Sequence, residues 1–318
     1  MRLVYFGTPE FAASQLEAIL DTGYEVVSVV TMPDKPAGRG KKILFSEVKK
    51  TALEHQLPLL QPEKLKDPDF LKALESCHAD LFVVVAFRML PAAVWKMPPL
   101  GTFNLHASLL PQYRGAAPIN HAIINGETET GLTTFFLNEE IDKGRVILQE
   151  KVTIRPDETA GELHDELMHL GNRLVVETIQ KIEKNDIQTV TQEELAAGST
   201  LKEAPKIFKD FCLIDWNRDC QSIYNHIRGL SPYPAAHSRL QTQESEPIDL
   251  KVYTSQIEIS SHSNPTGTVL TDGKTFLKVA AKDGYIHLTN LQQAGKKAMN
   301  ISEFLRGMRL ESGFLTMI

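Results

Sequence analysis

One uninterrupted apolar run, LFVVVA at residues 81–86, limits more than any other feature what this chain can fold into. A short apolar run rich in valine is typical of a strand buried on both faces of a parallel sheet. Near the start of the chain, residues 2–6 and 26–31 are two further β-rich segments, and an amphipathic stretch ending at residue 20 separates them. This strand–helix–strand order predicts an α/β domain with a Rossmann-like parallel sheet.

The same alternation continues through the first part of the chain. We expect helices at residues 46–55, 67–77, 117–125 and 160–182, and strands at 58–60, 131–137 and 146–154. Thr8 is expected to cap the first helix, with Pro9 at its first position. The first turn reads GTPE rather than G-x-G-x-x-G, and no acidic residue closes the second strand. A nicotinamide dinucleotide site is therefore disfavoured.

The character of the sequence changes after residue 183. A polar stretch predicts a linker at residues 189–205, which would join a catalytic domain at 1–188 to a second domain at 206–318. In the second domain a short helix is expected at 220–228. Short alternating runs at 250–254, 267–270, 275–280 and 285–291, with turn residues between them, predict a small C-terminal β-barrel resembling an OB fold.

Composition narrows the class of protein further. The chain has 318 residues, of which 42% are hydrophobic, and no apolar run approaches the roughly 20 residues of a membrane span. The first residues form a strand and a turn rather than a signal peptide, and the three cysteines lack metal-ligand spacing. We therefore expect a cytoplasmic protein without a membrane segment or a metal, and we expect a monomer.

The net charge of −6 argues against a simple nucleic-acid coat protein. It is unevenly distributed, however. Residues 201–318 contain 14 Lys and Arg against 12 Asp and Glu, a net +2, so the first 200 residues carry −8. A phosphate backbone would therefore meet less repulsion at the C-terminal part.

A pair of polar residues opens the segment NLHASLLPQYRG. Asn104 and His106 are two residues apart at the end of an expected strand, so their side chains point to one face. Open α/β sheets place their chemistry at such strand ends, and we expect Asp142 in IDKGR to be the third member of the group. The alternative for each residue is structural: a hydrogen-bonded histidine, a turn aspartate and an asparagine that caps the loop.

The chemistry of this trio points to acyl transfer. An amide and a cationic imidazole aimed at one point can stabilise a developing oxyanion, and a carboxylate favours the protonated imidazole. No G-x-S-x-G motif surrounds Ser108, so a covalent intermediate is not indicated. His106 has no neighbouring His or Glu at metal-ligand spacing.

A basic segment, PDKPAGRGKK at residues 33–42, follows the second expected strand. Its four cations are Lys35, Arg39, Lys41 and Lys42. It is either a solvated surface loop or a loop that binds phosphates and becomes ordered on RNA.

The segment NLHASLLPQYRGAAPI, with a D-x-G downstream, resembles the signature of folate-dependent formyltransferases. Four further segments, GTPEFAA, PDKPAGRGKK, VVVAFRMLP and LQQAGKKAM, extend the resemblance along nearly the whole chain. They are similar to the members of the family that formylate initiator methionyl-tRNA. The shared signature alone does not separate these members from those that act on glycinamide ribonucleotide. The basic loop and the C-terminal domain do, because a small nucleotide substrate needs neither.

The resemblance implies formyl transfer from 10-formyltetrahydrofolate, as co-substrate, to the amino group of methionine on initiator tRNA. The family's catalytic residues correspond to Asn104, His106 and Asp142. Its folate segment corresponds to Ser108, Leu109, Leu110 and Pro111, and the loop after the central strand, with Phe87, Arg88 and Leu90, should line the same pocket. Arg88 stands where a small residue is expected; it either points toward the glutamate tail of the folate or narrows the pocket.

The resemblance also implies that the basic loop lies against the acceptor stem, with Arg39 as its main contact. Candidate phosphate contacts from the second domain are Lys206, Lys209, Lys251, Lys296 and Lys297. AGKKAM is alternatively an ordinary turn.

Overall fold

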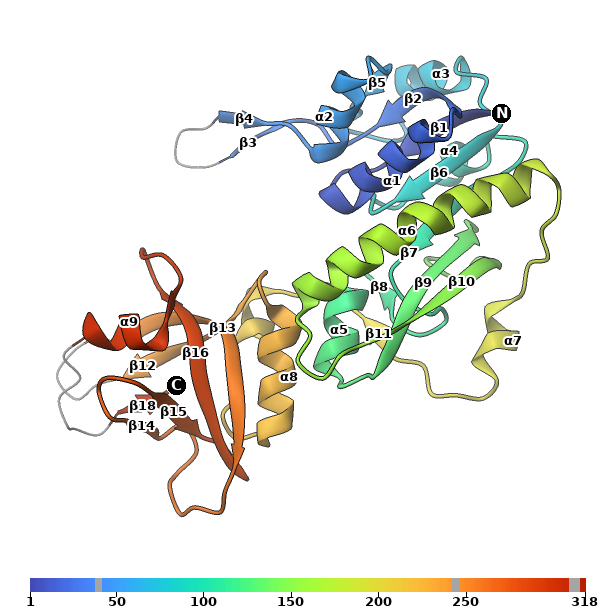
Figure 1. The fold of residues 1–318 in the computed structure, drawn as a ribbon. Helices are drawn as coiled ribbons and strands as arrows, with labels where there is room; N and C mark the ends of the chain where they lie inside the picture. The colour runs from blue at the N-terminus through green and yellow to red at the C-terminus, as the bar shows by residue number, and fades with distance from the viewer. Residues whose placement is uncertain (38–41, 242–245, 309–314) are drawn as a thin grey trace. The chain divides into compact units, whose positions relative to one another are not determined.

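The chain forms two compact units, each with its own seven-stranded sheet (Figure 1). The computed structural model describes residues 1–37, 42–241, 246–308 and 315–318. The first unit comprises residues 1–115, 130–152 and 164–203, and the second comprises 116–129, 153–163 and 204–318. The chain therefore passes between the units more than once.

The sheet of the first unit has the strand order β10-β9-β7-β6-β1-β2-β5. Pairing is parallel from β7 through β6, β1 and β2 to β5, whereas β9 runs antiparallel to β7. All five residues of β6 are buried, as its apolar sequence predicts. The strands are β1 (Arg2–Phe6), β2 (Glu25–Val30), β5 (Leu59–Leu60), β6 (Leu81–Val85), β7 (Thr102–His106), β9 (Glu129–Phe136) and β10 (Val146–Thr153).

Side-chain caps mark the start of two helices in this unit. Ser46 accepts a hydrogen bond from the backbone N–H of Lys49 at the start of α2, and Asp67 caps α3 in the same way. The expectation that Thr8 caps α1 is wrong: Pro9 is the N-cap residue, and the buried Thr8 hydroxyl lacks a partner among the described residues. The helices are α1 (Glu10–Asp21), α2 (Glu47–Glu54), α3 (Pro68–Glu75), α4 (Ala92–Trp95), α6 (Ala160–Glu183) and α7 (Gln192–Ala196).

Two further pairs of short strands, β3 with β4 and β8 with β11, lie outside the seven-stranded sheet. The basic segment runs through β3 (Lys35–Ala37) and β4 (Lys42–Leu44), which pair as a hairpin. Residues 189–205 contain α7 and the short strand β11 (Glu203–Ala204), which pairs with β8 (Arg114–Gly115). Part of the predicted linker therefore has regular secondary structure, and its residues up to 203 belong to the first unit.

The second unit is a nearly closed antiparallel barrel, as its short alternating runs predict. The strand order is β14-β15-β16-β13-β12-β18, and β17 pairs with β16. The backbone N–H of Val269 donates to the carbonyl of Leu315, and that of Met317 donates to Gly267, so that β18 approaches the start of β14. The strands are β12 (Ala236–Gln241), β13 (Ile248–Ile259), β14 (Val269–Thr271), β15 (Leu277–Ala280), β16 (Gly284–Gln293), β17 (Met299–Asn300) and β18 (Thr316–Met317).

The described residues of the second unit also include three complete helices and a 3-10 turn. They are α5 (Pro118–Ile124), α8 (Cys220–Leu230), α9 (Ile301–Arg306) and the turn Lys209–Cys212. α8 buries Ile223, Ile227 and Leu230 in the barrel core. The sequence did not indicate β12, β17, β18 or α9, whose short segments lack a clear alternation.

Candidate active site

The polar pair lies at the carboxyl end of β7, as expected. Asn104 is half-buried and His106 is buried, while Leu105 between them points to the other face and is also buried. β6 runs parallel beside β7, with Val84 opposite Asn104, so the loop that follows β6 emerges at the same edge of the sheet.

The hydrogen bond of His106 determines which nitrogen of the ring carries the proton. Nε2 lies 2.9 Å from the backbone carbonyl oxygen of Tyr113. Because a carbonyl only accepts, Nε2 must carry a proton. Nδ1 is therefore the atom that can accept a proton or, in the cationic ring, donate a hydrogen bond to a substrate.

Asp142 contacts the same segment two residues further on. Its carboxylate accepts a hydrogen bond from the backbone N–H of Gly115, at 3.2 Å. Among the described residues Asp142 and His106 share no direct hydrogen bond; both are tied to the Tyr113–Gly115 segment. The expected carboxylate–imidazole contact is thus replaced in this structure by an indirect one through the backbone.

Gln192 holds the Asp142 loop from the other side, and nothing in the sequence pointed to it. Its side-chain amide donates to the carbonyls of Asp142 (2.8 Å) and Gly144 (3.0 Å). Its oxygen accepts from Nε and Nη2 of Arg114, at 2.9 and 2.6 Å. Gln192 is 1% exposed, so four satisfied hydrogen bonds stabilise this buried amide.

The segment assigned to folate is itself well anchored. The hydroxyl of Ser108 donates to the carbonyl of Gln112 at 2.6 Å, and Leu110 packs with Phe135 and Val146. The side chains of Ser108, Leu110 and Pro111 are buried, and Leu109 is half-buried. Any contact of this segment with a folate is therefore expected from backbone groups or from Leu109.

The loop after β6 contributes mainly packing. Leu90 belongs to the core, and the ring of Phe87 packs against Phe6 at 5.8 Å between centroids. Arg88 is half-buried, and its guanidinium donates to the backbone carbonyls of Pro62 and Glu63. In the described part of the chain it shares no hydrogen bond with Asn104, His106 or Asp142. Burial lowers its pKa from the usual value, although Arg88 remains charged.

Two hollows on the surface lie away from these residues. One lies between α1 and α6, and the other, of about 1010 Å³, is on the second unit beside Phe208 and Tyr233. Neither is lined by Asn104, His106 or Asp142.

Comparison with known proteins identifies the family. A formyl transferase model matches residues 1–179, and a model of the formyl transferase C-terminal domain matches residues 206–309. The methionyl-tRNA formyltransferase of Bacteroides fragilis is 55% identical over 314 residues, covering 99% of this chain and 97% of that protein. This chain belongs to the methionyl-tRNA formyltransferase family. The family member from Flavobacterium johnsoniae is 50% identical over 308 residues, covering 97% and 96% of the two chains.

Solved structures share the fold of this methionyl-tRNA formyltransferase family member. WlaRD, a sugar 3N-formyl transferase solved with dTDP and 5-N-formyl-THF, aligns with a TM-score of 0.64 and 20% identity, covering 93% of this chain and 99% of that one. HypX from Aquifex aeolicus, solved with tetrahydrofolic acid, aligns with a TM-score of 0.62 and 17% identity, over 96% of this chain and 47% of that one.

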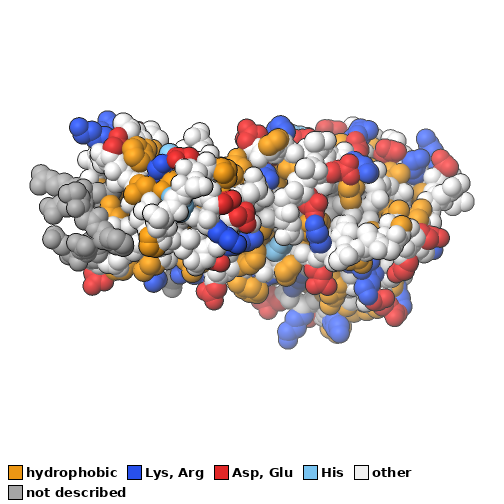
Figure 2. Space-filling model, turned by 90° about the horizontal axis from the view of Figure 1, so that it is seen from below, with side chains coloured by type: hydrophobic (Ala, Val, Ile, Leu, Met, Phe, Trp, Pro, Cys, Tyr) orange, Lys and Arg blue, Asp and Glu red, His pale blue; other side chains and the backbone are white. Residues whose placement is uncertain are grey.

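The cations assigned to tRNA are only partly described by the structure. Arg39 and Lys41 lie outside the described residues, while Lys35 and Lys42 are in β3 and β4. Lys206, Lys209, Lys251, Lys296 and Lys297 are exposed. Lys and Arg side chains alternate with Asp and Glu on the face that Figure 2 shows. In the described ranges no three His, Cys, Asp or Glu side chains are grouped to hold a metal, and none of the helices described could cross a membrane.

Proposed function

We propose that the chain transfers the formyl group of 10-formyltetrahydrofolate to the α-amino group of methionine on initiator methionyl-tRNA, giving N-formylmethionyl-tRNA. The observation that carries the proposal is that His106 and Asp142 both bind the Tyr113–Gly115 segment, in a chain that is 55% identical to a methionyl-tRNA formyltransferase. Asn104 lies two residues before His106 on the same strand, β7. An amide, an imidazole and a carboxylate at a strand end suit acyl transfer without a covalent intermediate.

The residues would act on an oxyanion. The neutral amine of methionine attacks the formyl carbon, and charge develops on the formyl oxygen. The amide of Asn104 and Nδ1–H of protonated His106 stabilise that charge. Asp142 orients the Tyr113–Gly115 segment, to which Nε2 of His106 is bound, and helps pass a proton through water to the departing folate nitrogen.

Different parts of the chain bind the two substrates, the folate and the tRNA. Residues 1–188 carry the chemistry and bind the folate beside residues 108–111, in a pocket whose wall is supported by the packing of Phe87 and Leu90. Residues 189–205 join this part to residues 206–318. The β3–β4 hairpin, with Arg39, and the exposed lysines of residues 206–318 contact the tRNA backbone. The protein acts as a monomer in the cytoplasm.

His106→Ala tests the catalytic assignment. We expect formyl transfer to fall by about 100-fold or more, because one oxyanion-stabilising donor is lost, while tRNA affinity stays within about twofold. Single-turnover formyl transfer and tRNA titration measure the two quantities. His169→Ala, which removes an exposed histidine of α6, is the matched control and should leave both unchanged.

Equal losses of transfer and of binding in His106→Ala would contradict the role of His106. Comparing charged initiator tRNA with uncharged tRNA and with amino-sugar nucleotides identifies the acceptor. Faster transfer to a small amine than to methionyl-tRNA would contradict the proposed substrate.

A further inference from the structure

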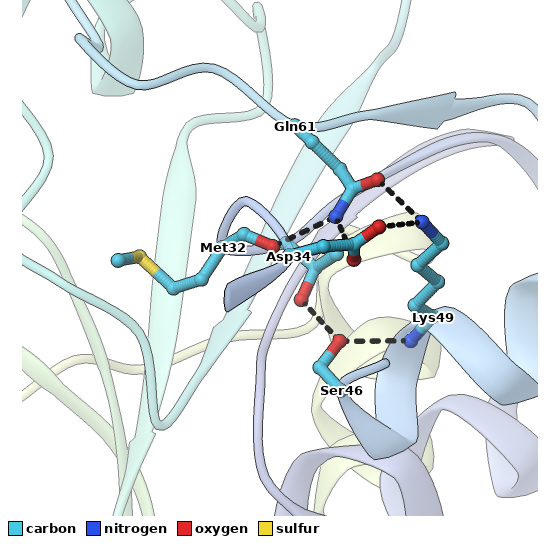
Figure 3. A network of polar contacts seen from close by, with 6 residues as sticks. Met32, Asp34, Ser46, Lys49 and Gln61 are labelled. Carbon is cyan, nitrogen blue, oxygen red and sulfur yellow. Dashed lines mark hydrogen bonds and ion pairs between the residues drawn. The ribbon is translucent and has the colours of Figure 1, made fainter. Parts of the chain in front are cut away.

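A compact polar cluster lies at the base of the β3–β4 hairpin, apart from the residues assigned above (Figure 3). Nζ of Lys49 lies 2.5 Å from Oδ2 of Asp34 and 2.9 Å from Oε1 of Gln61. The amide nitrogen of Gln61 donates to Oδ1 of Asp34 and to the carbonyl of Met32, both at 2.9 Å. Three side chains thus close a ring of hydrogen bonds around one carboxylate.

The ammonium group of Lys49 is fully engaged inside the protein. Its side chain is 11% exposed and that of Asp34 is 25% exposed. Nζ of Lys49 also lies over the ring of Phe45, 4.1 Å from the ring centroid, in a cation–π contact. A desolvated cation with these partners is poorly available to a phosphate. Hydrogen bonds from Lys49 and Gln61 lower the pKa of Asp34, so the carboxylate is charged at neutral pH.

The cluster holds both ends of the hairpin. Asp34 directly precedes β3, and Phe45 directly follows β4. The hydroxyl of Ser46, which caps α2, also lies 2.9 Å from the hydroxyl of Thr31, the residue directly after β2. In Figure 1 the hairpin projects from the rest of the first unit, so its direction depends on how these ends are held.

Hydrogen bonds from Arg88 connect the cluster to the loop after β6. Gln61 is followed by Pro62 and Glu63, whose carbonyls accept the hydrogen bonds of Arg88. The root of the hairpin is thereby joined through one short segment to the loop after β6, at the same sheet edge as His106.

We propose that Asp34, Lys49 and Gln61 are positioning residues that aim the β3–β4 hairpin at the tRNA, without touching the RNA themselves; the inference rests on the proposed function of the hairpin. Loss of any one of them frees the hairpin, so tRNA binding then includes the entropy cost of ordering it. Folate binding is unaffected.

Two substitutions separate positioning from direct contact, because the two roles predict opposite signs. If Lys49 bound a phosphate and Asp34 merely competed for it, Asp34→Asn would free the lysine and strengthen tRNA binding. If the residues position the hairpin, Asp34→Asn and Lys49→Met should both raise the Michaelis constant for methionyl-tRNA by about fivefold or more. The Michaelis constant for the folate should stay within about twofold of the wild-type value. The slope of log affinity against log salt stays at the wild-type value, whereas loss of a phosphate contact lowers it by about one.

Matched controls lie on the same helix. Lys50→Met and Glu47→Gln remove the same charges from an exposed pair on α2 and should change neither constant. Arg39→Ala, measured in parallel, should weaken tRNA use and lower the salt slope. Tighter tRNA binding in Asp34→Asn, or a lower salt slope in Lys49→Met, would overturn the inference. The inference would also be overturned if neither Asp34→Asn nor Lys49→Met changed tRNA use while Arg39→Ala weakened it. The proposed function would still hold in that case. If Arg39→Ala did not change tRNA use, the hairpin would not be part of the tRNA site, and this inference would be wrong as well.

Discussion

At the scale of single residues, the D-x-G of the Asp142 loop has a steric explanation. A Cβ placed on Gly144 would lie 1.5 Å from the carbonyl oxygen of Phe136, far inside van der Waals contact. The backbone of Gly144 also accepts a hydrogen bond from Gln192, so it is held from both sides. Only glycine allows this approach, and the approach places Asp142 within reach of Gly115.

Gly144→Ala should therefore displace the Asp142 loop. We expect kcat for formyl transfer to fall by about 100-fold, because a shift of about 1 Å in a catalytic group can have that effect. Steady-state kinetics, with near-ultraviolet circular dichroism to show that the variant is folded, measure it. In Gly307→Ala the new Cβ would meet its nearest neighbour at an ordinary 3.5 Å, and kcat should not change. An unchanged kcat in Gly144→Ala would contradict the structural role assigned to the loop.

At the scale of elements, α8 carries a buried histidine whose ionisation opposes folding. His226 is 7% exposed, its ring packs 5.6 Å from that of Phe211, and its Nε2 lacks a hydrogen-bond partner within the described part of the chain. Burial lowers the pKa of His226 to about 4.

This low pKa predicts a pH dependence of stability. Between about pH 6.5 and pH 4 the unfolded chain binds a proton at His226 that the folded chain does not. The free energy of unfolding should therefore fall as the pH falls through this window, by roughly 3 kcal/mol for this residue. His226→Leu should flatten the slope in urea titrations at a series of pH values, whereas replacing the exposed His169 by leucine should not. An equal slope in His226→Leu would contradict the prediction.

At the scale of the whole molecule, the second unit does not consist of one continuous stretch of chain. It includes α5, and Ile124 of α5 belongs to the same buried core as residues of α8 and the barrel. The side-chain amide of Asn120 donates to the carbonyl of Gly229 at 2.7 Å, and a Cβ on Gly229 would lie 2.5 Å from Ile124. The C-terminal segment alone therefore lacks part of its own core.

A fragment of residues 204–318 should consequently be less stable than the same segment in the intact chain. We expect a lower urea midpoint and binding of a dye that detects exposed apolar surface, because one face of α8 is uncovered. Gly229→Ala in the intact chain, which pushes α5 away from α8, should lower the free energy of unfolding by roughly 1–3 kcal/mol and so lower the urea midpoint as well. A fragment as stable as the intact chain would show that α5 is dispensable.

Local patterns were sufficient for much of this structure. The apolar run at 81–86 identified β6, the spacing of Asn104 and His106 placed both at the end of β7, and short alternating runs indicated the barrel. Each of these conclusions depends on the period of a strand or on residues close together in sequence. β12 and β18 were not predicted for two different reasons. β18 has only two residues, and β12, AHSRLQ, contains only two apolar side chains, so neither shows a clear alternation.

The sequence by itself determined the class of fold, the position of the polar pair and the family to which the chain belongs. Only the tertiary structure decided that Asp142 reaches His106 through the backbone of Gly115, that Gln192 supports the site, and that Arg88 holds residues 62–63. The reason is physical. Periodicity and turn chemistry act over a few residues, whereas these hydrogen bonds join residues 25 to 78 positions apart, and their partners are brought together only when the sheet and its loops have packed.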